Sequence, residues 1–219
     1  MPDLYAWVND RLGIMPELTY VLRRKIPAGA NWLYTFGSAT LFLFTLQAIT
    51  GGLLAIYYSP SPDHAYASIN YIMRDTAFGS LIRGIHHWAA SGMIVMILLH
   101  MLRVFFMGAY KYPREMSWMV GVVLLAFTLA FGFTGYLLPW DEKAYWATVV
   151  GTNISGSVPI VGNWMLRILR GGDDLGALTL SRFFAVHVML LPMAATLLIA
   201  IHLLMVIRQG ISHPPRRDE

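Results

Sequence analysis

Four long runs of apolar residues, each separated from the next by a more polar stretch, dominate the chain. Each run is long enough to cross a bilayer as an α-helix, which takes about 20 residues. Aromatic residues stand at both ends of the first run, as is typical of a membrane–water interface. We therefore predict an all-α membrane protein, a bundle of four transmembrane helices over residues 32–58, 80–108, 117–138 and 178–208.

The segments between the apolar runs carry most of the charged and turn-forming residues. Residues 1–31 are polar to mixed and predict an N-terminal helix that lies in the membrane interface. Residues 139–177 contain glycine, proline and several apolar residues, which predicts short surface helices between the third and fourth spans. The whole chain, 1–219, is expected to form a single domain.

The composition supports a membrane protein and narrows its chemistry. Of the 219 residues, 57% are hydrophobic and 13% are charged. The lack of cysteine excludes disulfides, thiolate ligands, iron–sulfur clusters and thioether attachment of a haem. The net charge of +4 comes from residues scattered around the apolar runs, so it indicates membrane orientation and not nucleic-acid binding. The Lys and Arg count predicts both termini on the cytoplasmic, electronegative (n) side.

Two pairs of histidines stand inside the second and fourth apolar runs. His86 and His100 are fourteen positions apart, and His187 and His202 are fifteen apart. In an α-helix the first pair falls within about 40° of one face and the second within about 60°. Imidazole is a common metal ligand, and an ionisable group at membrane depth is a functional candidate. Packing of the two helices side by side would therefore place His86 level with His187, and His100 level with His202.

Glycines repeat the same period in the other two runs. Gly37 and Gly51 are fourteen apart, and so are Gly121 and Gly135. Because glycine has no side chain, a flat macrocycle can approach the backbone there. Small-residue packing of helices is the alternative reading of the glycines alone.

Two arginines flank the histidines of the second run. Arg83 and Arg103 lie one turn beyond His86 and His100, toward the two surfaces. They are either snorkelling anchors or partners for the carboxylates of a haem. A ring at His87 points away from the face shared by His86 and His100, which excludes it from the set.

The spacing of the histidines favours haem over a compact zinc or copper site. A compact site takes ligands at i, i+3 or i+4, whereas these pairs are about four turns apart and occur twice. Two irons with two axial imidazoles each leave no open position for substrate, which suits electron transfer.

Longer motifs carry a resemblance to a known family. They are RGIHHWAASGMIVMILLHMLRVF, KYPREMSW, FGFTGYLLPWDEKAYWA and LTLSRFFAVH. The chain resembles cytochrome b6, the short split cytochrome b of b6f-type and Rieske–cytochrome b complexes, over nearly its whole length. The resemblance implies two noncovalent b haems, with His86 and His187 near the electropositive (p) face and His100 and His202 near the n face. It also adds Arg114, within KYPREMSW, to the cofactor-binding residues.

The resemblance implies a function in quinol oxidation. The chain would be the di-haem b subunit of a quinol:cytochrome c, or plastocyanin-type, oxidoreductase and would be inactive alone. It would carry electrons from quinol oxidation on the p side to a quinone site on the n side, in a proton-translocating Q cycle. The resemblance places the quinol pocket around Tyr136, Pro139, Trp140 and Ile160.

Partners and departures follow from the same resemblance. The family's proline–glutamate–tryptophan–tyrosine motif is absent here, so a three-helix partner like subunit IV would complete the quinol pocket. A Rieske iron–sulfur protein, a c-type cytochrome and quinone are the other implied partners, in a dimeric complex within a bacterial cytoplasmic or thylakoid membrane. The family usually tethers an additional c-type haem through a cysteine at the position of Thr35. Threonine cannot form the thioether, so no covalent haem is expected there.

Two other functions are compatible with histidines in apolar helices. One is the di-haem b membrane anchor of a dehydrogenase or hydrogenase, which also uses histidine pairs. The other is a transporter without haem whose histidines are proton relays or packing groups.

Overall fold

The computed structural model describes residues 3–13, 15–23 and 28–212, and within these ranges it contains helices and no β-strand. Arg24, Lys25, His213, Arg216 and Arg217, some of which enter the charge count, lie outside the described residues. The helices of the bundle are α3 (Phe36–Ala55), α5 (Gly79–Phe106), α6 (Glu115–Leu137), α9 (Ala177–Ala185) and α10 (Leu191–Gln209). A short 3-10 turn, η1 (Trp32–Thr35), leads into α3, and a π-helical segment, η2 (Val186–Leu190), joins α9 to α10.

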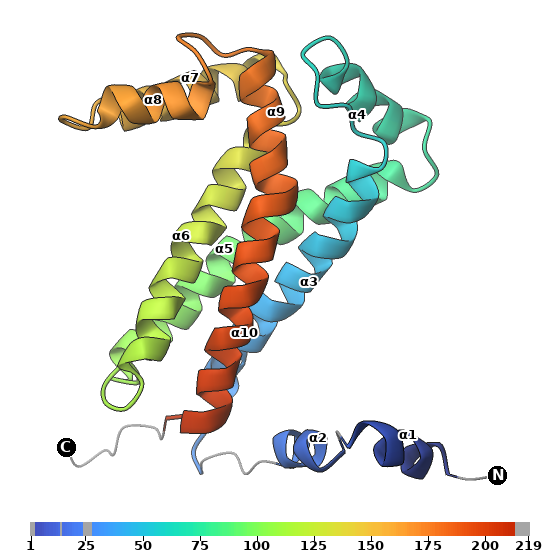
Figure 1. Cartoon of the computed structure of the whole chain (residues 1–219), viewed down its shortest axis with the longest axis vertical. Coiled ribbons are helices and arrows are strands. Elements are labelled where there is room, and N and C mark those ends of the chain that lie inside the picture. Colours follow the sequence, from blue (N-terminus) through green and yellow to red (C-terminus); the bar gives the residue numbers. More distant parts are fainter. Residues whose placement is uncertain (1–2, 14, 24–27, 213–219) are drawn as a thin grey trace.

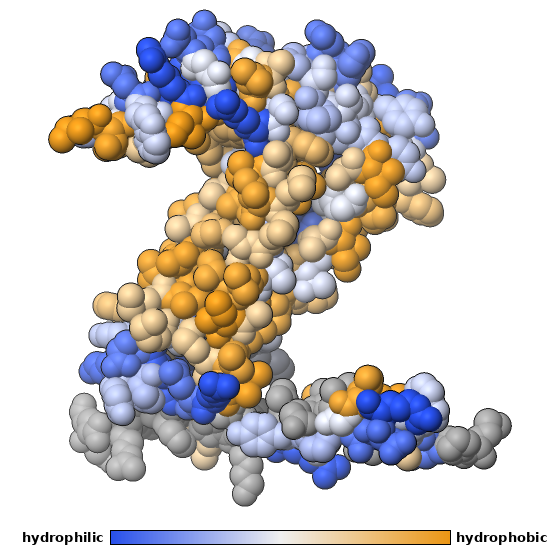
Figure 2. Space-filling view, in the orientation of Figure 1, coloured by the Kyte–Doolittle hydropathy of each residue, from blue (hydrophilic) through white to orange (hydrophobic). Residues whose placement is uncertain are grey.

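Four continuous helical stretches are long and apolar enough to cross a membrane: Trp32–Ala55, Gly79–Phe106, Glu115–Leu137 and Ala177–Gln209. The first ends three residues before the predicted limit of its span, because Ile56 and Tyr57 form a turn ahead of Ser59 and Pro60. The other three begin and end within two residues of the predicted limits. Figure 2 shows apolar side chains in a broad band around the middle of the bundle, with hydrophilic side chains at its two ends.

The shorter helices gather at the two ends of the bundle. α1 (Leu4–Leu12) and α2 (Met15–Leu22) lie beside the end of α10, whereas α4 (Ala65–Arg74), α7 (Glu142–Gly156) and α8 (Gly162–Arg170) cap the opposite end (Figure 1). Within the bundle, α3 packs chiefly against α5, and α6 packs chiefly against α10. The chain thus forms two antiparallel helix pairs that meet across a shared interior.

The buried apolar core lies at the end of the bundle that α4, α7 and α8 cap. Leu137, Leu180 and Phe183 are almost fully buried there, with Ala65 of α4 against them. The hydroxyl of Tyr58 donates a hydrogen bond to the backbone oxygen of Leu138 at 2.6 Å, which ties the end of the first span to the end of the third.

A buried arginine holds the connection between α6 and α9 in place. Arg170 donates from Nε to the Thr152 hydroxyl at 3.0 Å and from Nη2 to Asn153 Oδ1 at 2.9 Å. Its Nη1 reaches the backbone oxygen of Asp173 at 2.9 Å, and Nη2 also reaches that of Val149 at 3.3 Å. The planar guanidinium fork therefore joins α7, α8 and the loop that follows them.

Candidate functional site

The packing of α3 on α5 sets two of the predicted glycines against two of the predicted histidines. A Cβ atom added to Gly37 would lie 3.0 Å from Cε1 of His100, and one added to Gly51 would lie 3.0 Å from Cε1 of His86. Cβ contacts this short are rare, so alanine at either position would push the ring away. Both histidines of α5 thus point at α3 where α3 lacks a side chain.

The second helix pair repeats the arrangement. A Cβ atom added to Gly135 of α6 would lie 2.6 Å from Cε1 of His187, and one added to Gly121 would lie 3.7 Å from Cε1 of His202. The glycines alone favour small-residue packing of helices, and together with histidines at the matching spacing they predict the close approach of a flat macrocycle. In the structure, the space that each glycine leaves is next to an imidazole ring.

The π-helical segment contains His187 and compensates for the extra residue between His187 and His202. The backbone N–H of Leu191 bonds to the oxygen of Val186, five residues back, and Pro192, which has no N–H to donate, follows at once. A π-turn accommodates one extra residue within an α-helix. Fifteen positions from His187 to His202 therefore cover about the same rotation as fourteen from His86 to His100.

Two threonines contact the histidines, and the sequence analysis did not single them out. The Thr50 hydroxyl lies 2.9 Å from His86 Nδ1, and the Thr134 hydroxyl lies 3.0 Å from His187 Nδ1. Gln47 of α3 also donates to the backbone oxygen of His86 at 2.7 Å. The available signal was position, since each threonine directly precedes a glycine of the fourteen-residue period.

A cavity of about 380 Å³ opens between the helix pairs at the end of the bundle near α1 and α2. Its lining is mainly apolar and includes His100 from α5 and His202 from α10. Arg103, Arg114 and Tyr34 also line it. Apolar walls with two imidazoles and two guanidinium groups match the chemistry of a haem, which has a flat apolar ring, an iron and two carboxylates.

Two buried polar atoms around this cavity have no hydrogen-bond partner among the described residues: Tyr34 Oη and Arg103 Nε. The Arg103 guanidinium stacks 3.6 Å from the centre of the Tyr34 ring, and its Nη2 lies 3.5 Å from the Ser212 hydroxyl. Arg114 donates from Nε to the backbone oxygen of Gly210 at 3.2 Å. Buried donors seldom lack acceptors in folded proteins, so these atoms fit a site that receives a polar group.

The other predicted residues lie near the opposite end of the bundle and do not form one site within the chain. Arg83 is half-buried and directs Nη1 to the sulfur of Met73 at 3.6 Å. Tyr136 is exposed on α6, and Pro139 and Trp140 follow that helix, half-buried. Ile160 lies between α7 and α8 and is fully exposed.

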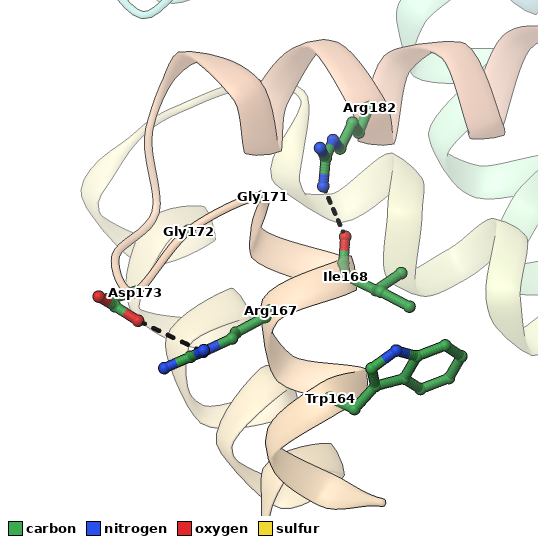
Figure 3. Close-up of a pocket in the computed structure, with 7 residues that line it drawn as sticks. All are labelled: Trp164, Arg167, Ile168, Gly171, Gly172, Asp173 and Arg182. Atoms are coloured by element: carbon green, nitrogen blue, oxygen red, sulfur yellow. Dashed lines mark hydrogen bonds and ion pairs between the residues drawn. The ribbon is translucent and has the colours of Figure 1, made fainter.

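A shallow surface pocket of about 520 Å³ lies on α8, away from the histidines (Figure 3). Arg182 donates to the backbone oxygen of Ile168 at 3.0 Å, and Arg167 lies 3.7 Å from an Asp173 carboxylate oxygen. Trp164 completes the wall. The two arginines thus have partners within the chain, which explains their positions without a ligand.

The described part of the chain has no cluster of three or more His, Asp or Glu side chains that could hold a metal ion directly. His87 and His64 are exposed and stand apart from the four histidines already described. His87 makes an edge-on contact with Trp88, at 5.4 Å between ring centres. Paired imidazoles against glycines are therefore the only repeated ligand-like arrangement in the described residues.

A family model, described as cytochrome b/b6/petB, matches residues 21–210. The chain belongs to the cytochrome b/b6 family. It is 47% identical to the menaquinol:cytochrome c reductase cytochrome b subunit of Geobacillus thermodenitrificans, over 96% of this chain and 98% of that protein. It is 45% identical to the subunit of that name from Bacillus subtilis (strain 168), with 96% and 98% covered. Cytochrome b6 of Prochlorococcus marinus (strain MIT 9215) is 41% identical, with 97% of each chain covered.

A solved structure has the same fold. A chain of a hyperthermophilic respiratory Complex III matches 99% of this chain with a TM-score of 0.90 at 32% identity. The present chain spans 60% of that chain's length.

Family membership confirms the resemblance drawn from the sequence, and the four apolar helices confirm an all-helical integral membrane protein. It also implies a b-type haem and interaction with quinone.

Proposed function

We propose that the chain is the di-haem b electron-transfer subunit of a quinol:cytochrome c oxidoreductase. The observation that carries the proposal is the repeated contact of a histidine with a glycine, twice in each helix pair. The names of the relatives from Geobacillus and Bacillus, menaquinol:cytochrome c reductase cytochrome b subunit, support the same reaction class.

The four histidines are the proposed axial ligands of two noncovalent haems. His86 and His187 would hold one, and His100 and His202 would hold the other. The shared cavity supports the second pair. The matching contacts of His86 with Gly51 and Thr50 and of His187 with Gly135 and Thr134 support the first. Each haem, when bound, supplies a one-electron redox centre, so the chain could carry electrons between the two faces of the membrane.

The surrounding residues of the chain would shape and charge these two sites. Gly37, Gly51, Gly121 and Gly135 leave room for the rings, as their contacts indicate. Arg103 and Arg114 would face carboxylates at one site, and Arg83 would do so at the other. Guanidinium groups suit such pairing because their donors form a fixed fork.

The haems of this proposal are held without a covalent link. Thr35 donates its hydroxyl to the backbone oxygen of Trp32 at 2.7 Å and cannot form a thioether. A covalent c-type haem at this position is therefore not part of the proposal.

Quinol would be oxidised away from the irons, because two imidazoles would be bound to each iron and leave no position for substrate. We place the pocket around Tyr136, Pro139, Trp140 and Ile160, near the end of α6. The exposure of Ile160 and Tyr136 supports a pocket that is completed by another chain. The proposed partner is a three-helix subunit like subunit IV. A Rieske protein and a c-type cytochrome would accept electrons, in a dimeric complex.

The proposed topology treats residues 1–219 as one domain. Its spans are 32–58, 80–108, 117–138 and 178–208, its interfacial segment is 1–31 and its p-side connection is 139–177. Both termini would face the n side, which the distribution of Lys and Arg supports.

The test is purification of the complex through a tag on this chain in mild detergent. We expect quinol-dependent reduction of a c-type cytochrome, co-purifying Rieske and three-helix subunits, and loss of activity in His86→Ala. Co-purification of a dehydrogenase or hydrogenase without quinol:cytochrome c activity would overturn the proposal.

A further inference from the structure

Two buried hydroxyls contact one pair of histidines and not the other. Thr50 is 4% exposed and is the only buried residue described in α3, and Thr134 of α6 is 8% exposed. Each hydroxyl lies within hydrogen-bond distance of a histidine Nδ1, at 2.9 Å for His86 and 3.0 Å for His187.

Each hydroxyl has already used its proton. Thr50 donates to the backbone oxygen of Leu46 at 2.7 Å, and Thr134 donates to that of Ala130 at 2.7 Å. A hydroxyl has one proton and two lone pairs, so toward the histidine it can only accept. Nδ1 must then be the protonated nitrogen of the ring. Nε2 is left with a free lone pair, which is the form that binds a metal.

The other pair of histidines lacks this support. The residues that directly precede Gly37 and Gly121 are Phe36 and Val120, neither of which carries a hydroxyl. No side-chain hydroxyl among the described residues bonds Nδ1 of His202, and the acceptor near its ring is the backbone of Ser117. The two ends of the bundle thus give their histidines different surroundings at Nδ1.

We propose that Thr50 and Thr134 are positioning residues that fix the tautomer and orientation of His86 and His187 and lower the reduction potential of the haem between them. An acceptor at Nδ1–H makes the imidazole a stronger donor to iron. A stronger donor favours the ferric state, so the potential falls. The effect is confined to one of the two haems. This inference rests on the proposed function, since it takes both histidines as axial ligands.

The test compares valine, which keeps the shape of threonine, with serine, which keeps the hydroxyl. We expect Thr50→Val and Thr134→Val to raise the midpoint potential of one haem and leave the other unchanged. Thr50→Ser and Thr134→Ser should stay near the unmodified protein. The readouts are optical potentiometric titration of the purified complex and the electron paramagnetic resonance of each low-spin haem. The component lost in His86→Ala assigns the two potentials.

Thr45→Val is the matched control. Thr45 is an exposed residue of α3 whose hydroxyl also bonds the oxygen four residues back, at 3.0 Å, without a histidine beside it. Both potentials should be unchanged in this variant. Selective loss of one haem in the valine variants, with serine retaining it, would also support a positioning role. If one valine variant does not accumulate, the other carries the test.

Three results would overturn the inference while leaving the proposed function intact. They are unshifted potentials in both valine variants, equal shifts in valine and serine variants, and equal shifts of both haems. An unmodified complex without haem would instead overturn the proposed function, and this inference with it.

Discussion

The π-helical segment at His187 leads to a prediction about helix register. Deleting Met189 leaves fourteen positions between the histidines of the fourth span, as in the second. Met189 is exposed, so its loss removes no core contact. The segment from His187 onward can then wind as an ordinary α-helix without rotating one histidine relative to the other. Pro192 disfavours a regular helix, so the deletion is best combined with Pro192→Ala, and Pro192→Ala alone is the control.

An insertion, the opposite change, gives a displacement of His202 that can be calculated from helix geometry. Inserting one alanine after Leu197, which is exposed in the regular part of α10, rotates His202 by about 100° and moves it about 1.5 Å along the axis. At a side-chain radius of about 5 Å, the ring shifts by roughly 8 Å. Metal–ligand distances tolerate changes of about 0.2 Å, so His202 can no longer share an iron with His100. His187 precedes the insertion and keeps its place.

The assay is haem content per polypeptide of the purified protein, measured as the pyridine haemochrome. We expect two haems in the deletion variant and one in the insertion variant. An insertion variant that retains both haems would refute the register argument, as would a deletion variant that loses one when Pro192→Ala alone keeps two.

Three further predictions concern packing. Gly135→Ala should displace His187 and lose one haem, because the added Cβ atom would lie 2.6 Å from the ring. Gly121→Ala should retain both haems, because its Cβ atom would lie 3.7 Å from the ring of His202. The haem content of each variant checks this prediction. Arg170→Met removes the hydrogen bonds that hold the connection before α9, at a cost of about 3 kcal/mol, so amide exchange in α7 and α8 should accelerate about 100-fold. Tyr58→Phe removes one buried hydrogen bond and should lower stability by about 1 kcal/mol in a thermal scan; an unchanged melting temperature would contradict this.

Much of the fold could be predicted from the sequence because a membrane imposes a simple pattern. Apolar runs of about 20 residues must be helices there, since the backbone has no other way to satisfy its polar groups. Residues fourteen positions apart lie on nearly the same face of a helix. The spacings His86–His100 and Gly37–Gly51 therefore predicted that each pair shares one face. The structure places each of the four glycines beside one of the four histidines.

Features that depend on local winding or on contacts between helices could not be predicted. The fifteen-residue step to His202 was interpreted as a 60° offset, because a helical wheel assumes uniform winding and the π-turn breaks that assumption. Thr50 was missed because its role depends on a partner thirty-six positions away. The glycines and histidines together predicted room for a macrocycle beside the backbone, which stays a prediction. The contact of each glycine with an imidazole depends on how the helices pack and could not be predicted.

The central claim is that two pairs of imidazoles each hold one haem. Its most direct test is the haem stoichiometry of the purified chain together with His86→Ala, His100→Ala and the double variant. We expect two b-type haems in the unmodified chain, one in each single variant and none in the double variant. The haem that remains in His86→Ala should have a different potential from the haem that remains in His100→Ala. Both haems persisting in a single variant, or no haem in the unmodified chain, would contradict it.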